Sequence, residues 1–403
     1  MISHALVHTY ELSIPILVVI WLTEFPVTTA VLGPVVAVGY ALFGIGALPS
    51  GVLADQYSTK LLVLVCMIGM GISFLLLSVA QGALTIGIAL GVWGVAASIH
   101  HPAALSLIST GVKERGTGFA YHGMAGNLGI AFGPLATALL LLFFGWRMTA
   151  GLLVVPAVIA AVYAVTAEFD EMAAVSADGG RTTDESTGGV SAFISDTKSL
   201  FTTGLALALL VVMMNGLFYR GVLTFLPDVL GSLTSGLIET PQLFEPGSPM
   251  AEQFDIASYL YSGLLMIGML GQYVGGKLTD RIPIAAGLAV TFGGLSVLAV
   301  LFVPTVTSGF GPLLAASALL GFLLFTVQPL YQAAIAEQSP PDDRGLSYGY
   351  TYLSNFGVGA AGAAAVGYLL TLTDPAGTFL VLAAVPATGA VIAVVLFRIT
   401  SNN

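Results

Sequence analysis

The sequence contains few charged residues, and this scarcity excludes a water-soluble enzyme. Asp, Glu, Lys and Arg make up 8% of the 403 residues, whereas hydrophobic residues make up 57%. A soluble domain carries roughly 25% charged residues, so most of this chain must face lipid or other apolar helices. The composition therefore predicts a polytopic membrane protein.

Cysteine and the common catalytic motifs are also lacking. The single cysteine, Cys66, lies in an apolar run, so the chain can form no internal disulfide. The sequence contains no P-loop, no HExxH zinc motif and no Asp-rich prenyl-phosphate motif. We therefore expect no enzyme activity, no cofactor and no nucleic-acid partner. A membrane enzyme or a receptor is kept only as an alternative class.

Apolar runs of about 20 residues or more dominate what is present, and each is long enough to cross a bilayer as a helix. We expect twelve such spans, at residues 4–22, 30–54, 60–80, 84–109, 117–143, 147–167, 204–230, 256–279, 284–303, 311–336, 346–370 and 376–398. The protein is expected to act as a monomer in the lipid bilayer.

A polar stretch at 168–199 divides the spans into two sets of six, and its composition is typical of a flexible linker. Motifs of the first set return in the second, where Gly51-Val-Leu-Ala-Asp55 recurs 225 positions later as Gly276-Lys-Leu-Thr-Asp280. Two more pairs follow in the same order: Arg115-Gly116 with Arg344-Gly345, and His101-Pro102 with Gln328-Pro329. The repeats predict an all-α fold of two pseudo-symmetric six-helix bundles, 1–167 and 200–403.

The basic residues indicate the orientation of the chain. With both termini inside, nine of the eleven Lys and Arg residues lie on the cytoplasmic side, Arg147 lies outside and Arg220 lies within a span. Basic loops are retained in the cytoplasm. We therefore expect cytoplasmic termini, a cytoplasmic linker and an inner or plasma membrane location.

Histidine is confined to spans one, four and five. His4, His8 and Glu11 are spaced i, i+4 and i+7, so they share one helix face. His100 and His101 lie about 100° apart on a helix, so only one of them is expected to point the same way.

An ionisable group inside a membrane is costly unless it faces a cavity or a partner, and histidine titrates near neutrality. We therefore expect a path for substrate or protons lined by His4, His8, Glu11, His101 and His122. We expect His101→Ala or Glu11→Gln to uncouple transport from a proton gradient. In the alternative interpretation, His4 lies among lipid headgroups and His100 bonds to a neighbouring helix.

His4 and His8 also have the spacing of metal ligands, and Glu11 would add an oxygen ligand. Because no Cys or His-rich loop accompanies them, we expect no metal site, and a divalent-metal transporter is the less favoured alternative.

Arg220 is the only basic residue near the centre of a span, about 24 Å along its helix from the inner end. This depth predicts that it lies in the membrane half opposite the histidines. It either attracts an anion in the cavity or pairs with Asp228 or Glu24. Polar faces in later spans add three expected cavity residues: Gln328, Tyr331 and Tyr352.

The repeated loop motif resembles that of the major facilitator superfamily, and the resemblance covers the whole chain. The first copy has Gly51, Asp55 and Lys60, with Gln56 where the family usually has Arg, and the second has Gly276, Asp280 and Arg281. The resemblance implies that Asp55 holds the start of the eleventh span while the cytoplasmic side is closed, with Arg115 and Arg344 as cationic neighbours. In the alternative interpretation, these charges only set the topology.

The fifth span resembles the antiporter motif of drug exporters through Gly129, Gly133 and Pro134, but it departs from the motif at Thr137-Ala138. The fourth span has Leu90 where exporters have a membrane Arg. Short motifs resemble the fosmidomycin-resistance branch: His4-x-x-x-His8, His101-Pro102, Asn127-Leu-Gly129, Gly145-Trp146-Arg147 and Phe225-Leu-Pro227. His8 stands where that branch is expected to have Asp.

The resemblance implies a secondary transporter that works by alternating access and exports a small amphipathic or anionic compound as an antiporter, in exchange for protons. An uptake permease for a small organic anion is the alternative.

The topology gives a direct prediction. A cysteine placed at Ser248 should react only with an impermeant reagent added outside, and one at Asp184 only with a reagent added inside. Labelling of both positions from one face would contradict the two-bundle arrangement.

Asp55→Ala gives a second prediction. It removes the attraction between a carboxylate and a helix start, worth roughly 0.3–1 kcal/mol. The population should then shift toward the state open to the cytoplasm, which probe accessibility of the inner cavity measures. Unchanged accessibility would leave Asp55 as a topology charge.

Overall fold

The computed structural model describes residues 1–173, 197–198, 200–234, 255–339 and 344–401. All regular structure in these residues is helical. Most of the predicted linker and both labelling positions, Ser248 and Asp184, lie outside the described residues.

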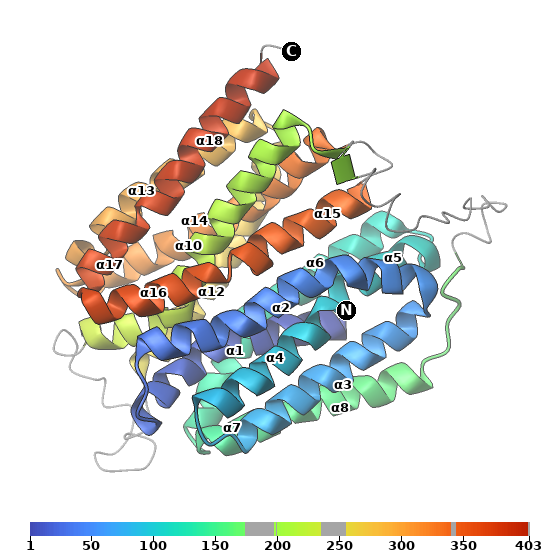
Figure 1. Ribbon diagram of the computed structural model, residues 1–403, viewed down its shortest axis with the longest axis horizontal. Coiled ribbons are helices and arrows are strands. Elements are labelled where there is room, and N and C mark those ends of the chain that lie inside the picture. Colours follow the sequence, from blue (N-terminus) through green and yellow to red (C-terminus); the bar gives the residue numbers. More distant parts are fainter. Residues whose placement is uncertain (174–196, 199, 235–254, 340–343, 402–403) are drawn as a thin grey trace.

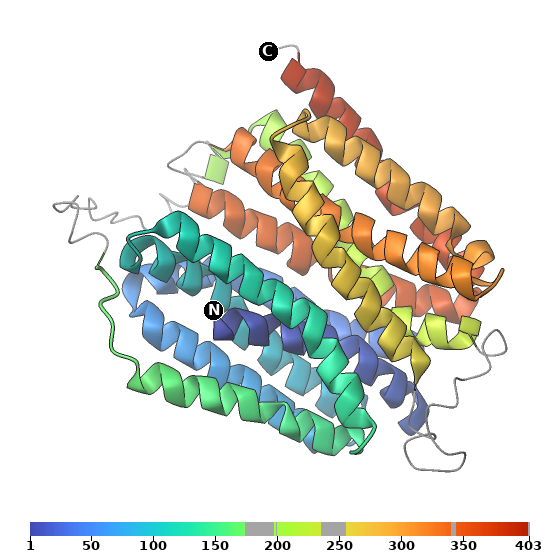
Figure 2. The ribbon, with the colours of Figure 1, turned by 180° about the vertical axis from the view of Figure 1, so that it is seen from behind.

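The helices form two bundles that lie side by side (Figure 1 and Figure 2). The first bundle consists of α1 (Ile2–Glu24), α2 (Thr29–Gln56), α3 (Thr59–Ser78), α4 (Ala83–Ser98), α5 (His100–Gly111), α6 (Arg115–Leu141), α7 (Trp146–Leu152) and α8 (Val154–Thr166). The second consists of α10 (Thr203–Thr234), α12 (Ile256–Thr279), α13 (Ile284–Val306), α14 (Phe310–Gln338), α15 (Arg344–Tyr352), the π-helical segment η3 (Leu353–Val358), α16 (Ala361–Leu372), α17 (Pro375–Leu382) and α18 (Ala384–Ser401).

Four of the spans are interrupted, the eleventh by η3 and the other three at a proline. Pro102, Pro156 and Pro386 lack the backbone N–H that would bond four residues back. The residues four positions before these prolines are Ser98, Leu152 and Leu382, and they are the last residues of α4, α7 and α17. Each pair of short helices therefore forms one bent span.

Eleven helical spans in the described residues are long and apolar enough to cross a membrane. The predicted eighth span forms α12, of 24 residues, but it includes Gln272, Lys277 and several hydroxyl groups and is not among the eleven. Its length and its packing against α14 and α6 match those of the other spans.

The internal repeat is visible as one contact made twice. A Cβ on Gly94 of α4 would lie 2.1 Å from the carbonyl oxygen of Gly39, and a Cβ on Gly321 of α14 would lie 2.2 Å from that of Leu264. Leu264 follows Gly39 by 225 positions and Gly321 follows Gly94 by 227, close to the offsets of the sequence motifs. Small residues let helix backbones approach this closely in lipid.

Glycine also sets the contact between the bundles. α2 packs along η3 and α16, where a Cβ on Gly44 would lie 2.0 Å from the backbone nitrogen of Gly357. Near the start of α2, a Cβ on Gly33 would lie 2.7 Å from the carbonyl oxygen of Ala363. The hydroxyl of Tyr259 on α12 donates to the Ala138 carbonyl of α6 at 3.4 Å.

Two glycines of α6 provide a matched test of this packing. A Cβ on Gly129 would lie 2.1 Å from the Ala5 carbonyl oxygen, whereas Gly123 has nothing within 4 Å. Gly129→Ala should destabilise the protein by about 1–3 kcal/mol through overpacking. Gly123→Ala should be neutral or stabilise it by up to about 1 kcal/mol. Thermal unfolding in detergent measures both, and equal stabilities of the two variants would contradict the packing role.

Candidate functional site

All five histidines meet inside the first bundle. They come from α1, α5 and α6, and the His4 ring lies at their centre, with its centroid 3.9 Å from that of His122, 4.8 Å from His8, 5.1 Å from His101 and 5.2 Å from His100. His4, His100, His101 and His122 are buried, and His8 is partly exposed. We call these five residues the histidine cluster.

One face of α1 carries a continuous chain of polar contacts, as the i, i+4, i+7 spacing predicts. Nδ1 of His4 donates to the backbone carbonyl of His122 at 2.7 Å. Nε2 of His4 and Nε2 of His8 are 3.1 Å apart, and Nδ1 of His8 lies 2.7 Å from Oε2 of Glu11. The chain therefore runs from the histidine cluster to a carboxylate.

Glu11 then joins the two bundles. Its Oε1 forms an ion pair with the guanidinium of Arg220 on α10, and each residue is only 2% exposed. A buried charge is tolerated when it has a partner of opposite sign. Among the described residues, this ion pair is the charged contact that links α1 to the second bundle.

Aromatic rings enclose the Arg220 guanidinium. Its central carbon lies 4.2 Å from the ring centroid of Tyr40, 4.5 Å from that of Phe356 and 5.2 Å from that of Tyr219. Cations over ring faces are stabilised by roughly 0.5–2 kcal/mol. Tyr40 and Phe356 come from different bundles, so the rings also meet at the bundle interface.

Two predictions about Arg220 are wrong. It pairs with Glu11 and so lies beside the titratable cluster, not in the opposite membrane half. Helix α10 has 32 residues, about 48 Å, so counting from its start overestimates depth. The alternative partner Glu24 instead accepts bonds from Arg147 and from Trp146 Nε1.

Two expectations about the histidines are also wrong. His100 and His101 both approach His4, although only one was expected to, because α5 starts at His100 after the interruption of the span. His4 is 8% exposed and contacts His122, so it does not lie among headgroups. His100 makes no hydrogen bond through either ring nitrogen within the described part of the chain.

The predicted cavity residues of the second bundle make different kinds of contact. The Tyr352 ring is 4.7 Å from that of His101, centroid to centroid. Tyr331 is buried on α14, and Gln328 accepts a hydrogen bond from Gln272 at 3.1 Å. The aromatic partners of Arg220 were missed because apolar spans are full of aromatic residues that only pack.

Of the predicted gate residues, the side chains of Asp55, Arg115 and Arg344 lie outside the described part of the structure. Asp280 and Arg281 are exposed at the end of α12, and Gly51 and Gly276 have no atom within 4 Å of a Cβ position. Lys60 donates from Nζ to the carbonyl of Ala167 at 2.6 Å, within the first bundle.

A capping contact beside Lys60 was not predicted. The Glu171 carboxylate accepts from the Ser58 hydroxyl at 2.6 Å and from the Thr59 backbone N–H at 2.7 Å, at the start of α3. Partial burial raises the pKa of the Glu171 carboxyl, but these hydrogen bonds outweigh it and the pKa is lowered overall. Glu171 thereby attaches the segment after α8 to the start of α3.

The antiporter-like motif packs against α1. A Cβ on Gly133 would lie 2.5 Å from the Cα of Thr9, and Pro134 follows within α6. The hydroxyl groups of Thr137 and Ser13 are 2.7 Å apart. This face of α6 therefore holds the helix that carries the polar chain.

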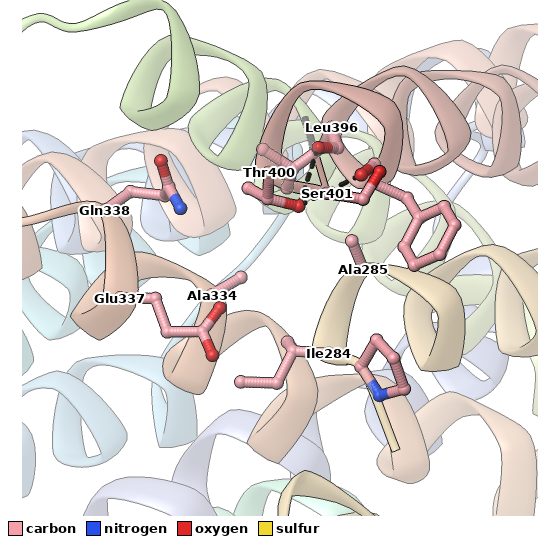
Figure 3. A pocket seen from close by; sticks show the side chains of 10 residues that line it. Ile284, Ala285, Ala334, Glu337, Gln338, Leu396, Thr400 and Ser401 are labelled. Carbon is pink, nitrogen blue, oxygen red and sulfur yellow. Dashed lines mark hydrogen bonds between the residues drawn. The ribbon is translucent and has the colours of Figure 1, made fainter. Parts of the chain in front are cut away.

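A separate pocket of about 390 Å³ lies within the second bundle, between the start of α13 and the ends of α14 and α18. Figure 3 shows Glu337, Gln338 and Thr400 around it. None of the predicted site residues lines this pocket, so it is distinct from the centre at Glu11 and Arg220.

Comparison with known proteins identifies the fold. Solved structures with the same architecture include the nucleoside transporter NupG, with 14% identity over 98% of this chain and 97% of that chain and a TM-score of 0.76. A POT family transporter in complex with a thioalcohol-conjugated peptide has 13% identity over 98% and 95% and a TM-score of 0.73. A bacterial homologue of the human lysosomal transporter Spinster, inward-facing and occupied, has 13% identity over 98% and 95% and a TM-score of 0.70.

At these identities the likeness shows the fold alone. A search of the curated proteins returns no significant match. A family model matches the chain at residues 4–305 and 242–403 and thus covers nearly all of it. The chain belongs to the Major Facilitator Superfamily of membrane transporters.

Proposed function

We propose that this transporter binds a small organic anion at Arg220 and moves it across the membrane by alternating access. The observation that carries the proposal is the buried ion pair between Glu11 of the first bundle and Arg220 of the second. As a superfamily member the chain is a transporter and not an enzyme. The substrate, direction and coupling ion are parts of this proposal.

Arg220 needs an anionic partner in every state of the cycle, because loss of one member of a buried pair costs about 3–5 kcal/mol. Glu11 supplies that partner in this structure. Alternating access moves one bundle against the other, so the contact between α1 and α10 must change. A substrate anion that replaces Glu11 as the partner of Arg220 therefore makes the movement of the bundles depend on bound substrate.

The rings around Arg220 indicate the rest of the substrate. Tyr40, Tyr219 and Phe356 present apolar surfaces within about 5 Å of the guanidinium. A small anion with an aromatic or hydrocarbon part would contact both the charge and the rings. A fully hydrated inorganic anion would make no apolar contact with these rings.

Export in exchange for protons is proposed on the motifs that resemble the drug-exporter and fosmidomycin-resistance branch. We propose that both termini and the linker lie on the cytoplasmic side of an inner or plasma membrane, which the distribution of the basic residues supports. The nucleoside transporter and the peptide-bound POT family transporter share only 14% and 13% identity with this chain, so their ligands are not transferred to it.

Uptake of an organic anion is the second candidate, and Leu90 favours it. This residue stands where exporters have a membrane Arg, and it is fully buried against Gly39. The same Arg220 site would serve uptake, so direction is decided by flux in oriented proteoliposomes.

Glu11→Gln tests the anion site. The variant leaves Arg220 without a counter-charge, so its unfolding free energy should fall by about 3–5 kcal/mol. Amphipathic organic anions should restore part of the loss and raise the melting temperature more than they do for the native chain. Thermal unfolding in detergent with a panel of such anions measures this.

Glu24→Gln is the matched control, because it breaks the exposed pair with Arg147 and should alter neither anion stabilisation nor flux. Arg220→Gln should abolish anion stabilisation and transport in proteoliposomes with an imposed pH gradient. Anion-dependent flux that survives in Arg220→Gln would refute the site.

A further inference from the structure

We propose that the histidine cluster is a metal site in which His4, His8 and His101 bind one divalent transition-metal ion of the zinc class. The site lies inside the first bundle and adjoins the anion site at Arg220 through Glu11. It draws on two ring nitrogens of the cluster that lie 3.1 Å apart.

The Nε2 atoms of His4 and His8 face each other at 3.1 Å. Two neutral imidazole nitrogens at this distance must share a proton or a cation, because two lone pairs repel. Zinc binds histidine nitrogen at about 2.0–2.1 Å in tetrahedral geometry, which places two ligand nitrogens about 3.4 Å apart. The observed spacing needs only a small shift to accept the ion.

The outer nitrogens of both rings are already fixed in the way that metal ligands require. Nδ1 of His4 bonds to the His122 carbonyl at 2.7 Å, and Nδ1 of His8 bonds to the Glu11 carboxylate at 2.7 Å. A metal-bound histidine almost always uses its second nitrogen on a carbonyl or carboxylate, which fixes the tautomer and raises the basicity of the ligand. The two facing Nε2 atoms are thereby left to coordinate an ion in place of the hydrogen bond between them.

His101 supplies the third ligand from α5. One ligand atom from each of the three residues lies within 4.8 Å of the other two. The His101 ring stands at 89° to that of His4 and at 62° to that of His8, so in-plane lone pairs can converge. His101 is buried, and its Nδ1 has no hydrogen-bond partner in the described chain.

A second triad, His4, His100 and His122, has similarly close ligand atoms. The rings of His4 and His122, however, are stacked at 3.9 Å and only 15° from parallel. The lone pairs of parallel rings lie in separate planes and cannot meet at one ion. The geometry therefore assigns the ion to His4, His8 and His101.

Ligand chemistry indicates the class of ion. Three neutral imidazoles suit zinc, cobalt, nickel or copper, whereas magnesium and calcium prefer oxygen. Both Glu11 oxygens are engaged, by His8 and by Arg220, so the carboxylate acts behind the ligands and not as one of them. Three protein ligands leave a fourth position for water or another small ligand. Entry is from the side of His8, whose side chain is 14% exposed.

The test uses the full-length protein in detergent after removal of metals with a chelator. Cobalt(II) is added and followed by its visible absorption, and zinc binding is measured by equilibrium dialysis. We expect one ion per chain and a cobalt spectrum typical of tetrahedral nitrogen coordination. His8→Gln and His101→Gln, on different helices, should each weaken binding by at least about 100-fold.

His122→Gln is the matched control from the other triad and should bind the metal within a few-fold of the native affinity. The His122 group that bonds to His4 is the backbone carbonyl, which the substitution leaves in place. Glu11→Gln should weaken binding on the order of 10–100-fold by loosening His8. Thermal unfolding confirms that each variant is folded.

Failure of the native protein to bind one ion would overturn the proposal. Loss of binding in His122→Gln with retention in His8→Gln would also overturn it. The measurement involves no transport, so its failure leaves the anion site at Arg220 to stand on its own test.

Discussion

A single ion pair inside the membrane connects the two bundles through opposite charges. Glu11 and Arg220 are both almost fully buried, and neither charge is stable there alone. Because they belong to different bundles, the pair is a structural contact and also a contact that any relative movement of the bundles must change. The rings of Tyr40 and Phe356, one from each bundle, extend this contact around the guanidinium.

The surrounding architecture makes such a movement possible. Several helices meet at glycine, which lets their backbones approach closely, as at Gly44 and Gly357 between the bundles. Within each bundle the same glycine-to-carbonyl contact recurs, at Gly94 and at Gly321. Each bundle is therefore held closely together within itself, while the interface between the bundles combines glycine contacts with aromatic pairs such as His101 and Tyr352.

The sequence predicted those features that depend on local spacing. Span positions follow from apolar length, and the polar face of α1 follows from the i, i+4, i+7 placement of His4, His8 and Glu11. The repeat in the loop motifs reappears as equivalent packing contacts. These predictions succeed because an apolar segment in lipid must satisfy its backbone hydrogen bonds internally and therefore forms a helix.

Features that depend on how helices tilt and meet could not be read from one sequence. Arg220 was placed in the wrong membrane half because depth was counted along α10 as if it stood upright from its first residue. His100 joins the cluster because Pro102 interrupts its span, which changes directions that an ideal helix would keep. The role of Tyr40 beside Arg220 had no sequence signal, because aromatic residues are common in all spans.

The polar chain on α1 also has a consequence for biosynthesis. A ribosome synthesises the chain from its N-terminal side, so Glu11 enters the membrane before Arg220 has been translated. Until α10 is inserted, His8, at 2.7 Å, is the side chain of the first bundle that holds the Glu11 carboxylate. The Glu11 carboxylate therefore gains its cationic partner only when the second bundle is inserted. This one charge couples the assembly of the two bundles.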